Sequence, residues 1–292
     1  MIIGFIGVAN MGQHIISRLS NYENNICVYD IDAKKTNSLK NKKTVLVCDT
    51  IHDVARNSDI LFTCLPSVEV VKSVLIGNDG EPGACHYLKL NSLCVDLSSS
   101  NPLVTKTLSE DLKLKSIRFL DAPLSGGVRG AANGTLTVMV GGDTFDFEFV
   151  KPLLQLFGAK IVHVGKSGSG QAAKCLNNLC SATGLLIASE CLNVAESFGI
   201  DPALFIDILN SSTGRNNSTE NKMKQFILSK TFESGFDIAL MQKDLISALD
   251  LASDKKVAMP LGAKCKEFWT EATDFLPGGS DHTEVIKWLN KS

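Results

Sequence analysis

Two polar residues in the middle of the chain have the types and the spacing for proton transfer. Lys174 and Asn178 lie four positions apart within Gln171–Phe198, a long and mostly apolar stretch that predicts one helix. Residues four apart share a helix face and can contact one ligand. An ammonium group on such a helix costs desolvation energy unless its charge has a use. A lysine beside a carbinol can take the hydroxyl proton while hydride leaves the carbon; the alternative is a lysine that extends to solvent.

A turn near the start of the chain has the pattern of a dinucleotide-binding site. The apolar strand Ile2–Ile6 runs into Gly7-Val8-Ala9-Asn10-Met11-Gly12. In G-x-G-x-x-G turns the first glycine makes the tight turn, the last lets the helix pack on the sheet, and the first helical amides face a pyrophosphate. Ala9 replaces the middle glycine here, and a plain tight turn is the alternative. The residues that we expect to contact a cofactor are Gly7, Ala9, Asn10, Met11 and Gly12.

A second apolar strand, Ile26–Tyr29, is followed by Asp30. An acid at a strand end roughly 20 residues beyond such glycines holds the ribose hydroxyls of NAD. A carboxylate also repels a 2′-phosphate, so Asp30 favours NAD over NADP. Lys34 and Lys35 follow closely and keep NADP open, although such lysines are more often a solvated helix face.

Two further strand ends bring candidate residues to the cofactor edge. Leu65 and Pro66 follow the fourth predicted strand, and Ser99 follows the fifth. Because the carboxyl ends of parallel strands line the cofactor crevice, we expect Pro66 near a ribose and Ser99 near the nicotinamide. For Ser98 and Ser100 we expect instead a cap on the helix that follows.

The loop after the sixth strand has the composition of an anion site. Ser125 is followed by Gly126 and Gly127, so a hydroxyl group and two glycine amides come together. Successive amides of this kind form a nest that suits a carboxylate. We expect a substrate carboxylate here, with an ordinary loop as the alternative.

Composition excludes several classes of protein. The chain has 292 residues, a formal net charge of −2 and no basic cluster that would indicate nucleic acid. No apolar run reaches the length of a membrane span, and no signal peptide precedes the first strand. The nine cysteines lack the spacing of a metal or disulfide framework. We therefore expect a cytoplasmic protein without a metal.

The chain divides by pattern into two halves. Alternating strands and helices predict a parallel sheet, and Gly165-Lys166-Ser167-Gly168-Ser169-Gly170 is a natural boundary. We expect a Rossmann-type NAD-binding domain over 1–165 and an all-α substrate and dimerisation domain over 166–292. The predicted strands are Ile2–Ile6, Ile26–Tyr29, Val45–Val47, Ile60–Cys64, Leu93–Leu97, Arg118–Ala122, Thr135–Val140 and Lys160–Val164. Asp201 and Pro202 predict a helix start after the long helix.

Together these segments resemble the β-hydroxyacid dehydrogenases, the family of 3-hydroxyisobutyrate dehydrogenase and tartronate semialdehyde reductase. The likeness covers essentially the whole chain and includes Met241-Gln242-Lys243-Asp244-Leu245. The resemblance implies a Rossmann-type domain joined by a long helix to an all-α domain, with the active site in the cleft. It implies hydride transfer between NAD and a small 3-hydroxy acid, of the 3-hydroxyisobutyrate or polyhydroxy-acid type, or the matching semialdehyde.

The same resemblance implies a role for individual residues. Lys174 is the catalytic proton donor and acceptor, and Asn178 positions the substrate beside it. Ser125, Gly126 and Gly127 hold the substrate carboxylate. The residues placed against the cofactor are Leu65, Pro66, Ser99 and Lys243.

Some features leave alternatives open. NADP-preferring relatives tend to carry Asn-Arg where this chain has Tyr29-Asp30. Asp281-His282-Thr283-Glu284 is similar to relatives that act on polyhydroxy acids, but it is equally well a helix cap. Arg215 is a candidate second contact to an anion.

Two other functions compete with this reading. One is a catalytically silent nucleotide-sensing or protein-binding module of the same fold, against which an intact Lys174 and Asn178 argue. The other is a 6-phosphogluconate dehydrogenase-like enzyme, which would need a further basic phosphate site. The apolar surface of Gln171–Phe198 also predicts a homodimer or homotetramer.

Overall fold

The computed structural model describes residues 1–21, 25–78 and 80–291, and they form two compact units, Met1–Lys174 and Cys175–Ser292. The division falls inside one helix, α7 (Ser169–Phe198). It lies beyond the boundary that the sequence predicts at residue 165. The reason is that the glycine-rich segment and the first turn of α7 bond to the end of a sheet strand, Asp121, and so belong to the first unit.

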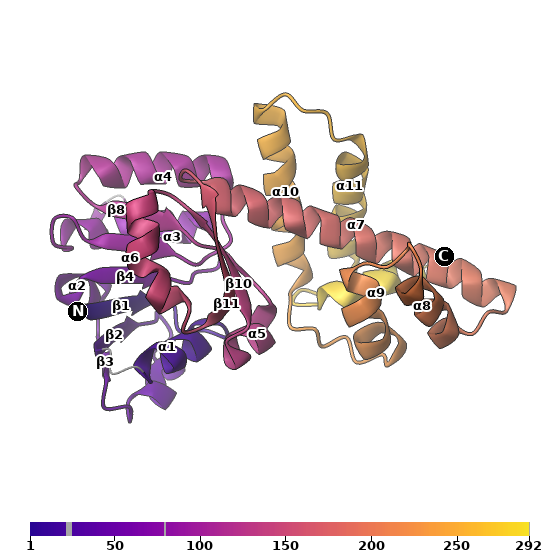
Figure 1. Ribbon diagram of the computed structural model, residues 1–292, viewed down its shortest axis with the longest axis horizontal. Helices are drawn as coiled ribbons and strands as arrows, with labels where there is room; N and C mark the ends of the chain where they lie inside the picture. Colours follow the sequence, from indigo (N-terminus) through magenta and orange to yellow (C-terminus); the bar gives the residue numbers. More distant parts are fainter. Residues whose placement is uncertain (22–24, 79, 292) are drawn as a thin grey trace. The chain divides into compact units, whose positions relative to one another are not determined.

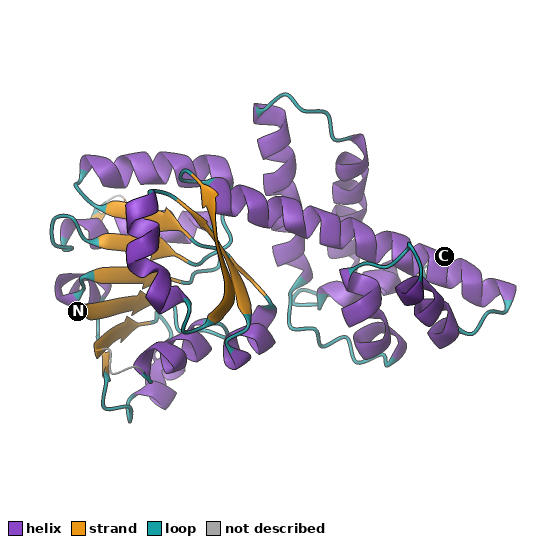
Figure 2. Cartoon of the chain, in the orientation of Figure 1, coloured by secondary structure: helices purple, strands orange, loops and turns teal. Residues whose placement is uncertain are grey.

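The first unit is built on a nine-stranded mixed sheet, drawn in orange in Figure 2. Along the main path the strand order is β11-β10-β8-β7-β4-β1-β2-β3. The pairs from β8 to β3 are all parallel, while β10 runs antiparallel to β8 and parallel to β11. The strands of this path are β1 (Ile2–Ile6), β2 (Asn25–Tyr29), β3 (Val45–Val47), β4 (Ile60–Thr63), β7 (Leu93–Asp96), β8 (Arg118–Asp121), β10 (Leu136–Gly141) and β11 (Gly158–Gly165).

The remaining elements of the first unit cover this sheet or connect its strands (Figure 1). Buried aliphatic and aromatic side chains pack on both faces of the sheet, as expected for a parallel sheet with helices on each side. Short β9 (Leu124–Ser125) pairs with β10, and β5 (Gly77–Asn78) pairs with β6 (Glu81–Pro82). The helices are α1 (Gly12–Ser20), η1 (Ala33–Leu39), α2 (Ile51–Asn57), α3 (Val68–Ile76), η2 (Ala84–His86), α4 (Pro102–Leu114), α5 (Gly127–Asn133) and α6 (Thr144–Leu154).

The second unit is helical throughout the part of the chain that the structure describes, apart from one isolated β-bridge. Its core surrounds the fully buried Trp269. Asp201 caps α8 at Leu204 N, as the sequence predicts. Besides α7 the helices are α8 (Pro202–Ser211), α9 (Asn217–Asn221), the π-helix η3 (Met223–Leu228), α10 (Ile238–Asp254), α11 (Pro260–Phe275), η4 (His282–Glu284) and α12 (Val285–Leu289). None of the helices within the described ranges is long and apolar enough to cross a membrane.

Candidate active site

The glycine turn after β1 leaves no room for side chains at its two ends. Gly7 has a φ of +99°, and a Cβ there would lie 2.2 Å from the carbonyl oxygen of Cys64. A Cβ on Gly12 would lie 2.1 Å from the carbonyl oxygen of Gly7. The strand, the turn and α1 are therefore packed backbone against backbone, which only glycine permits.

The middle of this turn is open to a ligand. Ala9 and Asn10 are exposed and Met11 is half-buried. No side chain caps the start of α1, although the first amides of a helix need partners. The turn therefore fits the diphosphate of a dinucleotide, and the exposed Ala9 in place of glycine takes up no buried space.

Asp30 lies directly against the glycine turn. Its carboxylate accepts the Val8 N–H at 2.7 Å and the Asp32 N–H at 2.9 Å, and the residue is only 9% exposed. Lys35 Nζ is 3.9 Å from Asp30 Oδ1. The carboxylate is held where the ribose of a dinucleotide on this turn would lie, with one cation beside it.

A buried acid organises the carboxyl edge of the sheet. Asp96 accepts the Thr63 hydroxyl at 2.9 Å and the Ser98 N–H at 3.0 Å, and the Ser98 hydroxyl in turn accepts the Leu65 N–H at 2.9 Å. Burial raises the pKa of the Asp96 carboxyl, although these hydrogen bonds oppose the shift. The network fixes the backbone at Leu65, next to Pro66, where we expect the cofactor.

The expectation that Ser98 and Ser100 cap a helix is wrong. Asn101 is the cap of α4, and its side chain accepts the N–H groups of Leu103 and Val104. The Ser98 hydroxyl accepts the Leu65 N–H, and the Ser100 hydroxyl lies 3.5 Å from the buried Asp96 carboxylate. Both side chains are therefore engaged at the strand ends. Ser99, between them, is half-buried.

The first turn of α7 is tied to the same edge. Asp121 accepts the N–H groups of Gly168 at 2.7 Å and Gln171 at 3.0 Å. The Gln171 side chain bonds the Ser98 carbonyl at 2.8 Å and the Ser100 N–H at 2.9 Å. Burial raises the pKa of Asp121, opposed by the two amides. Lys174 follows Gln171 by three residues, so this network fixes the position of its backbone.

The loop predicted to hold an anion follows the short strand β9. Ser125 ends β9 and is half-buried, while Gly126 and Gly127 are exposed. Gly126 has a φ of +126° and Gly127 a φ of +61°, and Gly127 begins α5. Positive φ values at both positions explain why glycine stands there.

Lys174 and Asn178 are both buried on α7, at 7% and 6% exposure. Asn178 donates its side-chain N–H to Asp244 Oδ2 at 2.5 Å, and Asp244 is 2% exposed. Lys243 Nζ lies 3.6 Å from the other oxygen of Asp244. In the second unit the structure therefore brings Asn178, Asp244 and Lys243 together.

Asp244 is a buried partner of Asn178 that the sequence reasoning did not single out. The signal for it was an acid placed directly after Met241-Gln242-Lys243 and before Leu245. Such an acid needs a partner when buried, and Asn178 is that partner. The other candidate, Arg215, is well exposed and pairs with Glu220 at 3.6 Å.

Comparison with known proteins agrees with this geometry. Residues 2–165 match the family model described as the NAD binding domain of 6-phosphogluconate dehydrogenase. Residues 168–289 match the model described as NAD-binding of NADP-dependent 3-hydroxyisobutyrate dehydrogenase. The chain is 35% identical over 286 residues to a 2-(hydroxymethyl)glutarate dehydrogenase of Eubacterium barkeri, covering 98% of this chain and 93% of the relative. The chain belongs to the β-hydroxyacid dehydrogenase family.

Other members of this β-hydroxyacid dehydrogenase family are similar over their whole length. The mitochondrial 3-hydroxyisobutyrate dehydrogenase of Drosophila melanogaster is 33% identical, with 99% of this chain and 89% of the relative covered. A structure of Mycobacterium tuberculosis 3-hydroxyisobutyrate dehydrogenase with L-serine has a TM-score of 0.88 and 27% identity, with 99% of this chain and 98% of that chain covered. The protein is therefore an NAD(P)-dependent hydroxyacid dehydrogenase with a Rossmann-type domain followed by a helical domain, as the sequence predicts.

Proposed function

We propose that this dehydrogenase oxidises carboxylates that carry a hydroxymethyl group on the carbon next to the carboxylate. The observation that carries the proposal is the buried Lys174, one helical turn before Asn178, which Asp244 holds in place. In support, the unit HO–CH2–CH–COO⁻ occurs in the two compounds that appear in the relatives' names, 2-(hydroxymethyl)glutarate and 3-hydroxyisobutyrate. It also occurs in L-serine, which appears in the name of the similar structure. Polyhydroxy acids such as glycerate contain it as well.

The proton is handled by Lys174 in this proposal. Oxidation breaks the O–H bond and one C–H bond of the carbinol, and a C=O double bond forms. NAD⁺, which the turn from Gly7 to Gly12 would hold, would supply the acceptor for the hydride that leaves carbon. Lys174, with its amine unprotonated, takes the hydroxyl proton, and in the reverse direction its ammonium returns the proton to the semialdehyde oxygen. NAD⁺ and the hydroxy acid thus give NADH, the semialdehyde and one proton.

Other residues position the substrate and the cofactor. The amides of Gly126 and Gly127 and the Ser125 hydroxyl bind the substrate carboxylate. Asn178 cannot rotate freely because Asp244 accepts from its amide group, and its oxygen accepts the Asn177 amide at 3.2 Å. In this proposal the same oxygen also contacts the substrate hydroxyl group. The residues that we propose to contact the cofactor are Gly7, Ala9, Asn10, Met11, Gly12, Asp30, Leu65, Pro66, Ser99 and Lys243.

A substrate series tests this proposal. Initial rates of oxidation should be measured with 3-hydroxyisobutyrate, 2-(hydroxymethyl)glutarate, glycerate and threonate, each with NAD and with NADP. The reverse reaction should be measured with succinic semialdehyde and NADH or NADPH. We expect the highest kcat/KM for an acid with the hydroxymethyl unit, and a lower one when the alcohol is moved one carbon further from the carboxylate. Normal cofactor binding without turnover of any of these compounds would instead support a catalytically silent module.

Asp30 is expected to decide the choice of cofactor. Asp30→Asn removes a charged acceptor from the ribose, which costs about 1.5–3 kcal/mol, or roughly ten- to hundredfold in the Kd for NAD. It also removes the repulsion of a 2′-phosphate, so NADP binding should improve. The control is Lys35→Ala, which should weaken NADP and leave NAD nearly unchanged. A wild-type protein that already prefers NADPH would show that Asp30 does not face the ribose.

The outer face of α7 is expected to meet another subunit. Leu179, Leu185 and Leu192 are buried, but Ile187 and Val194 are 51% and 69% exposed. Light scattering at micromolar concentration should give a dimer or tetramer. Ile187→Glu with Val194→Glu should shift this mass toward the monomer.

The control for assembly is Leu114→Glu, at an apolar position on α4 in the first unit that is 87% exposed. A wild-type protein that is monomeric across the accessible concentration range would refute the oligomer.

The cytoplasmic location stays a prediction from the cysteine content, since several relatives are named mitochondrial.

A further inference from the structure

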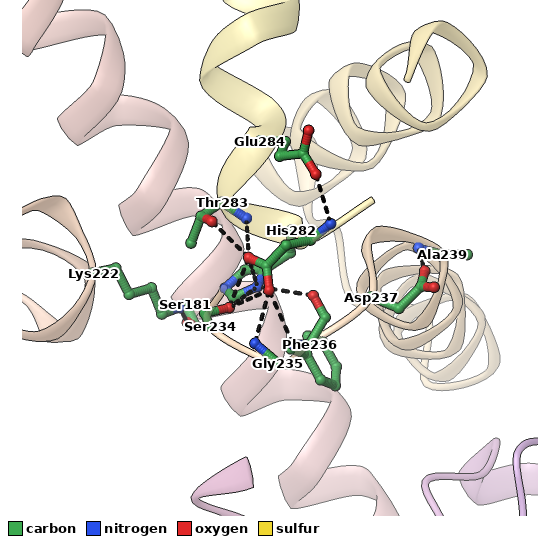
Figure 3. Close-up of polar contacts among 11 residues, drawn as sticks. Ser181, Lys222, Ser234, Gly235, Phe236, Asp237, Ala239, His282, Thr283 and Glu284 are labelled. Atoms are coloured by element: carbon green, nitrogen blue, oxygen red, sulfur yellow. Dashed lines mark hydrogen bonds and ion pairs between the residues drawn. The ribbon is translucent and has the colours of Figure 1, made fainter. Parts of the chain in front are cut away.

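The carboxylate of Asp281 joins two segments of the second unit that are far apart in sequence. Its Oδ2 accepts the Gly235 N–H at 2.8 Å and the Phe236 N–H at 3.2 Å, and the Ser234 hydroxyl lies 2.8 Å from both carboxylate oxygens. Its Oδ1 accepts the N–H of Thr283 at 2.9 Å and the Thr283 hydroxyl at 2.6 Å. In Figure 3 the dashed lines from Ser234, Gly235 and Thr283 converge on this one carboxylate.

The two oxygens therefore have different tasks. Oδ1 caps the short helix η4, where Glu284 completes a capping box by accepting the Asp281 N–H at 3.0 Å. This part confirms the helix-cap interpretation of the Asp281–Glu284 motif. Oδ2 goes beyond a cap, because it holds Ser234, Gly235 and Phe236, the segment that leads into α10. An asparagine could accept at only one of the two positions.

Backbone contacts lock the same two segments together. The His282 N–H donates to the Phe236 carbonyl at 2.8 Å, and the Ile238 N–H donates to the Ser280 carbonyl at 2.9 Å. Ile238 is the first residue of α10. Asp237 caps α10 by accepting the Ala239 N–H at 2.7 Å, and the backbone contacts tie this start of the helix to the segment around Asp281.

The charge state of this cluster is stable around neutral pH. Burial raises the pKa of Asp281, but hydrogen bonds from His282, Thr283 and Ser234 outweigh it and hold the pKa well below its usual range. Burial lowers the pKa of His282, and the charge of Lys222 lowers it further, against the opposing effect of Asp281. Lys222 itself reaches the Ser181 hydroxyl of α7 at 3.0 Å (Figure 3). Around neutral pH the Asp281 carboxylate is therefore ionised and the neighbouring His282 imidazole is neutral.

The helix that starts at this cluster carries Asp244. Asp244 follows Ile238 by less than two turns of α10 and bonds Asn178 on α7. A helix transmits a shift of its first turn to residues this near, since its backbone hydrogen bonds keep it rigid. Displacing the start of α10 would therefore change the distance between Asp244 and Asn178.

We propose that Asp281 is a positioning residue of the reaction, whose Oδ2 fixes the start of α10 so that Asp244 orients Asn178 toward the substrate. The proposal rests on the proposed function, because it assigns Asn178 to the substrate. Asp281 contacts neither substrate nor cofactor in this proposal and acts through Asp244 alone.

Asp281→Asn in the full-length protein tests the proposal. Misplacing a positioning group by about 1 Å costs up to roughly 10²-fold, so we expect kcat to fall on the order of 10–100-fold with the Kd for NAD unchanged. The matched control is Asp201→Asn, which alters another helix cap of the same unit, at Leu204. It should change Tm little and leave kcat within about twofold of wild type, since asparagine caps a helix about as well as aspartate does.

A double-mutant cycle separates positioning from general destabilisation. In an Asn178→Ala background, Asp281→Asn should lower kcat by less than threefold, because Asn178, through which Asp281 acts, is gone. If the two substitutions acted independently, their separate fold-changes in kcat would multiply. Multiplying effects, or a kcat for Asp281→Asn equal to that of the Asp201 control, would overturn the proposal.

A readout without turnover keeps this test apart from the proposed function. The side-chain amide NMR signals of Asn178 should shift in Asp281→Asn and stay in place in Asp201→Asn. If wild type oxidises no hydroxy acid but these signals shift as expected, the substrate assignment fails and the link from Asp281 to Asn178 stands. Unchanged signals in Asp281→Asn would refute the link even in an active enzyme.

Discussion

Lys174→Ala is expected to lower kcat by roughly 10²–10⁴, the usual range for loss of an acid–base group. Lys174 is buried on the first turns of α7, whose start is bonded to Asp121 and Ser98. Removing the amine leaves this network in place, because Gln171 makes those contacts. The dissociation constant for NAD should therefore stay nearly unchanged, and so should Tm.

The matched control is Lys166→Ala, an exposed lysine in the loop just before α7. It should leave kcat and KM unchanged, so that a loss at Lys174 cannot be assigned to net charge. Steady-state kinetics with the best substrate of the series, together with fluorescence titration of NAD, measure both quantities. Near-normal turnover of Lys174→Ala would remove Lys174 from the mechanism.

Gly7→Ala is expected to have the largest effect on the first unit. The φ of +99° alone costs a non-glycine residue about 1–3 kcal/mol, or a fall of about 2–12 °C in Tm. The methyl group would in addition lie 2.2 Å from the carbonyl oxygen of Cys64, which must move away. That oxygen belongs to the backbone next to Leu65, so NAD binding should be lost together with stability.

Gly278→Ala is the control, since a Cβ at Gly278 meets no atom within 4 Å and the residue lacks a positive φ. Thermal unfolding and NAD titration of both variants give the comparison. If Gly7→Ala had the same Tm and the same Kd for NAD as Gly278→Ala, the close packing of the turn against Cys64 would not be required for the cofactor site.

The sheet was predictable because its strands are short apolar runs closed by turn residues. The predicted Ile2–Ile6 matches β1, and Ile60–Cys64 and Leu93–Leu97 extend only one residue beyond β4 and β7. β9 was not predictable, since two residues carry no periodic pattern and Ser125 pairs only because β10 lies beside it. The domain boundary depends in the same way on Asp121, whose bonds to Gly168 and Gln171 no local pattern encodes.

In the candidate site, residues that belong to a local sequence pattern could be predicted. Hydrogen bonds between residues far apart in the sequence could not. Gly7, Gly12 and Asp30 follow from one strand–turn–helix pattern. Asp244 and Asn178 are 66 residues apart, and their bond exists only in the folded second unit. Ser98 was misassigned for the same reason, because its true partner, Leu65, lies 33 residues earlier in the chain.

Transfer of deuterium tests the hydride chemistry most directly. The enzyme would be supplied with NAD⁺ and 3-hydroxyisobutyrate carrying deuterium on the carbinol carbon, and the reduced nicotinamide analysed by NMR. We expect one deuterium per turnover on the nicotinamide ring, and roughly 10²–10⁴-fold less deuterium transferred in the same time by Lys174→Ala. Formation of the semialdehyde without deuterium in the cofactor would contradict hydride transfer from the carbinol carbon to NAD, and so would a bound cofactor that stays oxidised with every hydroxy acid of the series.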